Sequence, residues 1–112
     1  MPVYVDDMYK TSLGSYGRMK MSHMIATSEE ELHAMALKIG VDRRHWQAPQ
    51  NHSISHYDIC ASKRALAVSN GAIEITMRQA AKMSMFNKKN GRMPFSVEEA
   101  ETWWDHLKGV KN

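Results

Sequence analysis

The stretch MKMSHMIATSEEELHAMALKIG (residues 19–40) decides the fold, because a strand pattern runs directly into a helix pattern. Its first seven residues alternate well enough for a β-strand, on which successive side chains point to opposite faces. One face of that strand carries Met21, His23 and Ile25. A strand followed at once by a helix is typical of an α/β domain.

The helix within this stretch has clear signals at both ends. Ser28 and Glu31 have the spacing of a capping box, and the acidic residues of the first turn suit the positive end of the helix dipole. Gly40 is a typical residue just beyond a helix. The core-facing positions recur at i, i+3, i+4 and i+7, and they are Leu32, Met35, Ala36 and Ile39.

Weaker patterns on either side of this unit complete the outline of the fold. The elements predicted there are a strand at 3–5, a loop at 9–18, a long loop at 41–61 with a short turn or strand near Ser55–Ile59, a helix at 62–70, a strand at 72–76, a helix from 76 to about 85, and a last helix at 96–112. The order is therefore β–β–α–loop–α–β–α–α. We expect an α/β fold with a small sheet of about three strands, packed with helices.

The chain is expected to form one domain over residues 1–112. An α/β core covers 1–86, a basic connector covers 87–95, and an amphipathic C-terminal helix covers 96–112. The apolar face of that helix consists of Ala100, Trp103, Trp104 and Leu107. On a sheet this small, two tryptophans on one helix face favour a homodimer.

The composition excludes several classes of protein. Of 112 residues, 43% are hydrophobic and 24% are charged, as in ordinary globular domains. No apolar run approaches the roughly 20 residues that span a bilayer. The single cysteine, Cys60, excludes an internal disulfide and a multi-cysteine zinc site, and the first residues lack the apolar segment of a secretory signal. We therefore expect a cytoplasmic protein without a membrane association.

The net charge of +3 has a local source, because Lys82, Lys88, Lys89 and Arg92 lie together without an acid between 82 and 92. Such a segment permits weak attraction to nucleic acid, and a solvated loop explains it equally well. No P-loop, dinucleotide-binding glycine motif, nucleophile elbow or EF-hand loop is present.

Histidine and aspartate residues are the candidates for catalysis and metal binding. A neutral imidazole can accept a proton near pH 7, and a nearby carboxylate can fix its tautomer, so His56, Asp58 and His23 are the candidate catalytic residues. Asp6 and Asp7 directly follow the first strand, where adjacent carboxylates can hold a divalent cation. A strand-end turn is the structural alternative for these two residues.

Four further residues are candidates for ligand binding. Arg18 and Arg64 suit a phosphate, because guanidinium binds phosphate through two parallel hydrogen bonds. Tyr57 offers a ring for stacking, and His33 lies beside the apolar stripe of the helix. Together with the candidate catalytic residues, they predict a phosphorylated, nucleotide-like ligand.

Several segments resemble a family of domains of unknown function found in tailed phages and prophages. The resemblance covers about residues 3–80 and rests on the segments YVDD, YGRMKMSHMIA, EEELHAMALKIGV, SHYDI and SKRALAVSNGAIEIT. It implies an accessory protein encoded by a phage, and it brings no reaction, cofactor or ligand with it. The candidate site residues fall within the matching segments.

One leading hypothesis and two alternatives follow. The leading hypothesis is a small phage accessory protein that binds a phosphorylated nucleotide-like ligand to counter host defence signalling, in the cytoplasm of the host. Hydrolysis of that ligand as a phosphodiester or nucleotide, with a divalent metal, stays open beside simple binding. The alternatives are a protein–protein inhibitor or adaptor that uses the helix with Trp103 and Trp104, and a weak nucleic-acid binder that uses residues 82–92.

Overall fold

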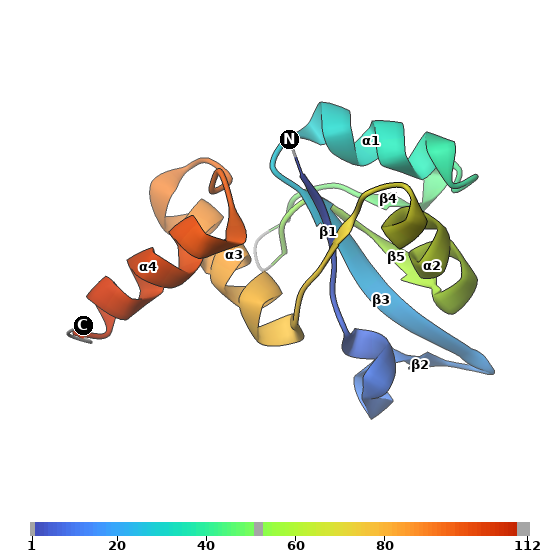
Figure 1. The fold of residues 1–112 in the computed structure, drawn as a ribbon, viewed down its shortest axis with the longest axis horizontal. Coiled ribbons are helices and arrows are strands. Elements are labelled where there is room, and N and C mark those ends of the chain that lie inside the picture. Colours follow the sequence, from blue (N-terminus) through green and yellow to red (C-terminus); the bar gives the residue numbers. More distant parts are fainter. Residues whose placement is uncertain (1, 51–52, 110–112) are drawn as a thin grey trace.

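The computed structural model describes residues 2–50 and 53–109 and has an α/β architecture (Figure 1). Its strands are β1 (Val3–Val5), β2 (Ser15–Tyr16), β3 (Met19–Ala26), β4 (Trp46–Gln47), β5 (His56–Cys60) and β6 (Ile73–Glu74). Its α-helices are α1 (Glu29–Lys38), α2 (Ala61–Ser69), α3 (Met77–Asn90) and α4 (Val97–Leu107). Three short 3-10 helices are η1 (Met8–Lys10), η2 (Ser12–Gly14) and η3 (Arg43–His45). The predicted fold class is confirmed.

The strands form one sheet in the order β4-β5-β3-β1-β6, and β2 pairs with β3 outside this path. The β1–β6 pair is parallel, and the other pairs are antiparallel. The prediction of about three strands was wrong, because the described residues contain six. β2 and β4 have two residues each, and so short a strand shows no alternation in the sequence.

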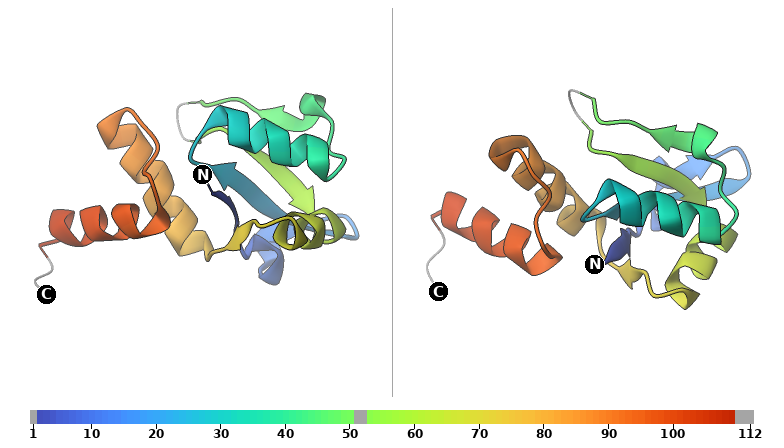
Figure 2. Two further views of the ribbon diagram at one scale, coloured as in Figure 1. Left: turned by 45° about the horizontal axis from the view of Figure 1, so that its top comes forward. Right: turned by 90° about the horizontal axis from the view of Figure 1, so that it is seen from above.

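Helices cover both faces of the sheet, with α1 and α2 on one face and the α3–α4 hairpin on the other (Figure 2). The alternation along β3 places Met24 and Ala26 in the cluster with α1 and α2, and Ile25 in the cluster with α3 and α4. This is the alternation that the sequence predicts for β3. All three residues of β1 are buried, because helices pack on both faces of the strand: Val3 and Val5 belong to the cluster with α1 and α2, and Tyr4 belongs to the cluster with α3 and α4.

The predicted start of α1 is confirmed. The Ser28 side chain accepts a hydrogen bond from the backbone N–H of Glu31 at 3.2 Å. The chain leaves the helix through Gly40, whose φ of +78° suits glycine because it has no Cβ. The first strand, β1, also has its predicted bounds.

Three predicted connections contain regular structure. The loop predicted at 9–18 contains the end of η1, all of η2 and the strand β2, which is held by pairing with β3. α3 begins at its predicted cap, Thr76, but continues to Asn90, so the connector predicted at 87–95 is helical over its first four residues. The buried Phe86 anchors this last part of α3 to the core. The loop predicted at 41–61 contains η3, β4 and β5, and its residues 51–52 lie outside the described residues.

The predicted C-terminal helix begins at its expected cap, where the Ser96 side chain accepts from the Glu99 N–H at 3.1 Å. α4 ends at Leu107, and residues 110–112 of the predicted element lie outside the described part. Trp103 packs edge-on against Phe86, with ring centroids 5.5 Å apart. No helix in the described residues is long and apolar enough to cross a bilayer.

We expect the substitution Tyr4→Phe to loosen α4 from the sheet. The buried Tyr4 hydroxyl accepts the backbone N–H of Val97 at 3.2 Å, and that N–H belongs to the first turn of α4, where no intrahelical partner exists. Leaving it unpaired should lower the free energy of unfolding by about 1–3 kcal/mol, measured by urea denaturation. Tyr16→Phe is the matched control, since Tyr16 is 70% exposed. Equal losses in both variants would contradict this account of α4.

Candidate functional site

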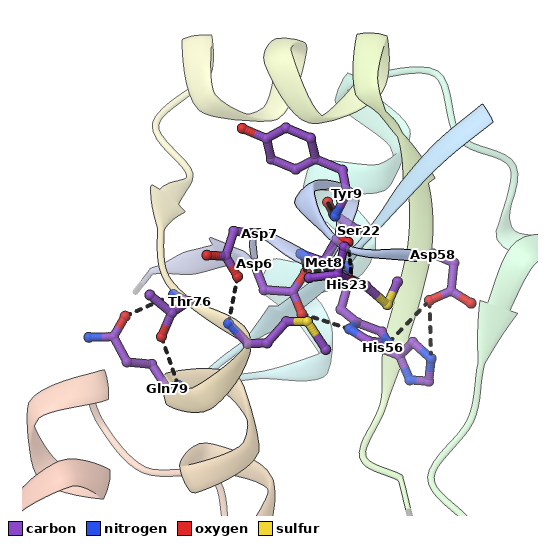
Figure 3. Close-up of polar contacts among 12 residues, drawn as sticks. Asp6, Asp7, Met8, Tyr9, Ser22, His23, His56, Asp58, Thr76 and Gln79 are labelled. Atoms are coloured by element: carbon purple, nitrogen blue, oxygen red, sulfur yellow. Dashed lines mark hydrogen bonds and ion pairs between the residues drawn. The ribbon is translucent and has the colours of Figure 1, made fainter. Parts of the chain in front are cut away.

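The face of the sheet that is turned toward α3 brings together His23, His56 and Asp58, which we call the His–Asp cluster (Figure 3). In the antiparallel pair β3–β5, His23 lies directly opposite Asp58. His56 precedes Asp58 by two residues on β5, so its side chain points to the same face. The three residues predicted as catalytic therefore converge.

The atoms of the His–Asp cluster face one another at ion-pair distances that are too long for hydrogen bonds (Figure 3). Asp58 Oδ1 lies 3.7 Å from His23 Nε2 and 3.6 Å from His56 Nε2, and both distances exceed hydrogen-bonding range. The two imidazole rings meet edge to face at a centroid distance of 5.3 Å. Asp58 Oδ1 is buried and has no hydrogen-bond partner among the described residues, whereas Asp58 Oδ2 accepts from Gln47 Nε2 at 2.6 Å.

The opposite ring nitrogen of each histidine has a partner that accepts hydrogen bonds. His23 Nδ1 lies 2.7 Å from the carboxylate oxygen Oδ2 of Asp6, and His56 Nδ1 lies 2.7 Å from the backbone oxygen of Ile54. Because neither oxygen can donate, both Nδ1 atoms donate. In the neutral rings, the unprotonated atom is then Nε2, and both Nε2 lone pairs are on the side of Asp58.

The Asp6 carboxylate accepts three hydrogen bonds, and two of them, from the ring and the backbone of His23, hold that residue in place. It is 1% exposed, and its Oδ1 accepts from the backbone N–H groups of Met8 at 3.1 Å and His23 at 2.9 Å. Burial acts to raise the pKa of Asp6, but the hydrogen bonds from the His23 ring and backbone outweigh it and lower that pKa below its ordinary value of 3.8. The Asp6 carboxylate in turn raises the pKa of His23 above 6.5, against the opposing effect of burial.

A cavity of about 380 Å³ lies between the sheet and α3, and we call it the α3 cavity. Its polar end is formed by Asp6, His23 and His56. The rest of its described lining is mostly apolar and consists of Ile25, Ser53, Ile54, Met77, Ala80, Ala81, Ser84 and Met85. Two members of the His–Asp cluster therefore border a space large enough for a small molecule.

The structure gives Asp6 and Asp7, the residues predicted as metal ligands, separate partners. Asp6 is bonded to His23 and Met8, and Asp7 Oδ1 accepts the backbone N–H of Met77 at 2.8 Å, at the first turn of α3. Neither belongs to the His–Asp cluster, the group that in the described residues has the spacing of metal ligands. Asp6 orients a member of that cluster, and Asp7 fixes the start of the helix that lines the cavity.

Two residues predicted to bind ligand, His33 and Tyr57, lie on the other side of the sheet. His33 Nδ1 is 2.8 Å from the Tyr57 hydroxyl, and the His33 ring packs edge-on against Trp46. Tyr57 lies between His56 and Asp58 on β5, so strand alternation turns it to the opposite face. The structure does not bring this pair to the α3 cavity.

The two predicted phosphate-binding arginines are also away from the cavity lining. Arg64 is buried, and it donates from Nε to the backbone oxygen of Asp6 and from Nη1 to Glu74, both at 2.9 Å. Its guanidinium also stacks on the ring of Tyr9. Arg18 is exposed in the turn between β2 and β3. Arg64 thus joins α2 to β1 and β6 and has few donors left for a ligand.

The segments behind the two alternative hypotheses are partly engaged within the chain. Lys82 pairs with Glu101 at 3.8 Å, and Arg92 pairs with Glu99 at 2.7 Å. Lys88 and Lys89 are exposed at the end of α3. On α4, Trp103 is partly buried against Phe86, so less of its ring is available to a protein partner.

Sequence analysis missed several residues of this site. Gln47, which bonds Asp58, belongs to a two-residue strand without a recognisable pattern. Met77, Ala81 and Met85 line the cavity from α3, and their helical spacing of four was the available signal. That signal predicts a shared face but not which surface the face meets.

The fold and site define a small α/β protein with an imidazole–carboxylate cluster beside a cavity. The chain belongs to the DUF4031 family, described as proteins of unknown function, whose family model matches residues 3–87. The match includes the whole His–Asp cluster and most of α3, and α4 lies beyond it. Searches of curated proteins and of solved structures each found no significant match.

We expect Asp6→Asn to destabilise the fold and to release the His23 ring from its fixed orientation. The substitution removes the charge that the His23 ring bonds, and the free energy of unfolding should fall by about 2 kcal/mol in urea denaturation. The pKa of His23, followed by NMR titration, should fall toward 6.5. Asp7→Asn is the control, because an asparagine oxygen can still accept the Met77 N–H. An unchanged pKa of His23 in the Asp6 variant would argue against the role given to Asp6.

Proposed function

We propose that the α3 cavity binds a small phosphorylated, nucleotide-like molecule and that the His–Asp cluster promotes hydrolysis of its phosphate ester. The observation that carries this proposal is the convergence of two imidazole Nε2 atoms and an unpaired carboxylate oxygen beside a cavity of about 380 Å³. Reactive groups at one end of a mostly apolar pocket are the usual arrangement of a small-molecule site.

The apolar part of the cavity suits the ring system of a nucleotide. Ile54, Met77 and Met85 offer apolar contacts, and the flexible methionine side chain in particular adjusts to the shape of an aromatic ring. The two serines of the lining can bond the polar edge of a base. A ring bound there would place its attached phosphate at the end with His23 and His56.

The phosphate end of the ligand would face His23 and His56, which are the basic residues of the described cavity lining. Arg64 is not needed for this role, since it already has Asp6 and Glu74 as partners. In the reaction, a water oxygen bonds to phosphorus, the ester P–O bond breaks, and the departing oxygen leaves with a proton. The cluster would orient and activate that water.

The proposed context is a phage-encoded accessory protein in the cytoplasm of the host. The segments that resemble phage and prophage sequences support it, and they contain the whole His–Asp cluster. Destruction of a nucleotide signal would counter a host defence that depends on that signal. A cavity of a size that admits a small molecule fits this role better than binding of long nucleic acids.

The test combines a thermal-shift screen with product analysis, using nucleoside phosphates, cyclic mononucleotides and cyclic dinucleotides. A ligand at about 100 times its Kd should stabilise the protein by about 2.7 kcal/mol, and chromatography should detect the hydrolysed product. Ala81→Trp should abolish both effects by filling the cavity. Ala65→Trp, at an exposed position on α2, should leave both unchanged.

If no compound in the screen stabilises the protein, the nucleotide part of the proposal is refuted. Stabilisation without product would leave a binding protein and remove the hydrolase. If Ala81→Trp binds as well as the unmodified chain, the ligand lies elsewhere. His56→Ala should retain less than a tenth of the hydrolysis rate, since general acid–base or nucleophile-activating groups contribute about 100-fold or more.

A further inference from the structure

We infer that His23, His56 and Asp58 bind one divalent transition-metal ion, with Zn²⁺ the best match to the ligand set. The inference goes beyond the proposed function, because metal binding can be measured without any substrate. It rests on the proposed function in one respect, the role of the ion in hydrolysis. Three observations support it: the spacing of the ligand atoms, their orientation, and an unpaired buried oxygen.

The spacing of the three ligand atoms is close to that of a tetrahedral site. With metal–ligand bonds of about 2.0–2.2 Å, neighbouring ligand atoms lie about 3.3–3.5 Å apart. The observed distances from Asp58 Oδ1 are 3.7 Å to His23 Nε2 and 3.6 Å to His56 Nε2. All three atoms lie within 4.8 Å of one another. A shift of a few tenths of an ångström brings both distances from Asp58 Oδ1 into range. The two ring nitrogens, at most 4.8 Å apart, would have to approach each other by up to about 1.3 Å.

The orientation of both imidazoles is fixed from behind, as in established metal sites. A metal-bound histidine usually donates its other ring nitrogen to a carboxylate or a backbone carbonyl, which fixes the tautomer and raises the basicity of the ligand. His23 does so to Asp6, and His56 does so to the carbonyl of Ile54. Asp58 is held in the same way, by the bond from Gln47 to its other oxygen.

Asp58 Oδ1 accepts no hydrogen bond within the described residues, and its two imidazole neighbours carry a positive charge only when they are protonated. Buried polar atoms almost always have a hydrogen-bond partner, and an exception requires a physical reason. Two nitrogen lone pairs and a carboxylate oxygen that face one point repel one another until a cation lies between them. A proton on His23 Nε2 would attract Asp58 Oδ1, but it would leave the lone pair of His56 Nε2 without a partner. A metal ion uses all three.

The ligand set selects the kind of metal. Two imidazoles and one carboxylate suit Zn²⁺ and neighbouring transition metals, whereas Mg²⁺ and Ca²⁺ prefer oxygen ligands. Three protein ligands are the usual number in a catalytic zinc site, with the fourth position left for water or substrate. Since His23 and His56 line the α3 cavity, that position would be accessible from the cavity.

The ion would supply the water activation that the proposed hydrolysis needs. A water bound to Zn²⁺ ionises near pH 7 and releases its proton to solvent. The remaining hydroxide bonds to phosphorus, and the ester P–O bond breaks. The departing oxygen then takes a proton from water, so that atoms and charges balance.

The experiment uses the full chain after dialysis against a chelator and titrates it with Co²⁺, whose visible absorption reports a tetrahedral site, and then with Zn²⁺ in competition. We expect one ion per chain, displaced by Zn²⁺ and not by Mg²⁺. His56→Ala and Asp58→Asn should each weaken binding by ~100-fold or more, since each removes a direct ligand. Asp58→Asn should fold normally, because an asparagine oxygen can still accept the hydrogen bond from Gln47.

Two further variants sharpen the result. His45→Ala is the matched control, since His45 is an exposed histidine outside the cluster, and its affinity should equal that of the unmodified chain. Asp6→Asn should weaken binding by about 10- to 100-fold while keeping the tetrahedral spectrum, as expected for a residue that only positions a ligand.

The absence of saturable binding would overturn the inference, and so would binding that survives in both His56→Ala and Asp58→Asn. Equal loss in His45→Ala would show non-specific binding to histidines and would overturn it too. Metal binding without nucleotide hydrolysis would refute the proposed function and leave the site intact. Stabilisation by a nucleotide without metal binding would overturn the metal site and leave the proposed ligand binding intact.

Discussion

The hydrogen bonds between Asp6 and His23 are the interaction on which the rest of the site depends. The carboxylate lies at the end of β1, and the residue that it bonds lies on the neighbouring strand β3. It accepts from the backbone as well as from the ring, so the pairing of the two strands and the orientation of the imidazole share one anchor. Arg64 bonds the backbone oxygen of the same aspartate and brings α2 and β6 to this point. A charged group inside a small core is stable here because each of its oxygens has donors.

Strand alternation divides the polar residues of β5 into two groups with different surroundings. His56 lines the cavity and Asp58 lies on the same face of the strand, whereas Tyr57 between them faces α1 and bonds His33. The Tyr57–His33–Trp46 group is packed and satisfied, as structural polar residues usually are. The His–Asp cluster contains an oxygen without a hydrogen bond, and this distinguishes it from the satisfied group on the other face.

Local signals in the sequence predicted the parts of the fold that local physics determines. The cap at Ser28, the cap at Thr76 and the alternation of β3 each involve residues close together in the chain, and the structure confirms them. The strands β2 and β4 were missed because their stability comes from pairing with a longer neighbour rather than from their own residues. His23, His56 and Asp58 were predicted as a group, but the register that brings them together depends on long-range strand pairing. The burial of Arg64 depends likewise on a partner 58 positions away.

The Tyr4–Val97 hydrogen bond has a consequence for how the protein could diversify. α4 lies outside the segment matched by the family model, yet it supports α3 from behind, and α3 forms one wall of the cavity. The described lining of the cavity lies within the matched segment, whereas α4, which packs against α3, lies beyond it. An exchange of the C-terminal helix would reshape the wall against which a ligand rests while the strands that hold the reactive groups stay as they are. The position of the cavity wall and the geometry of the His–Asp cluster depend, in this architecture, on separate sets of contacts.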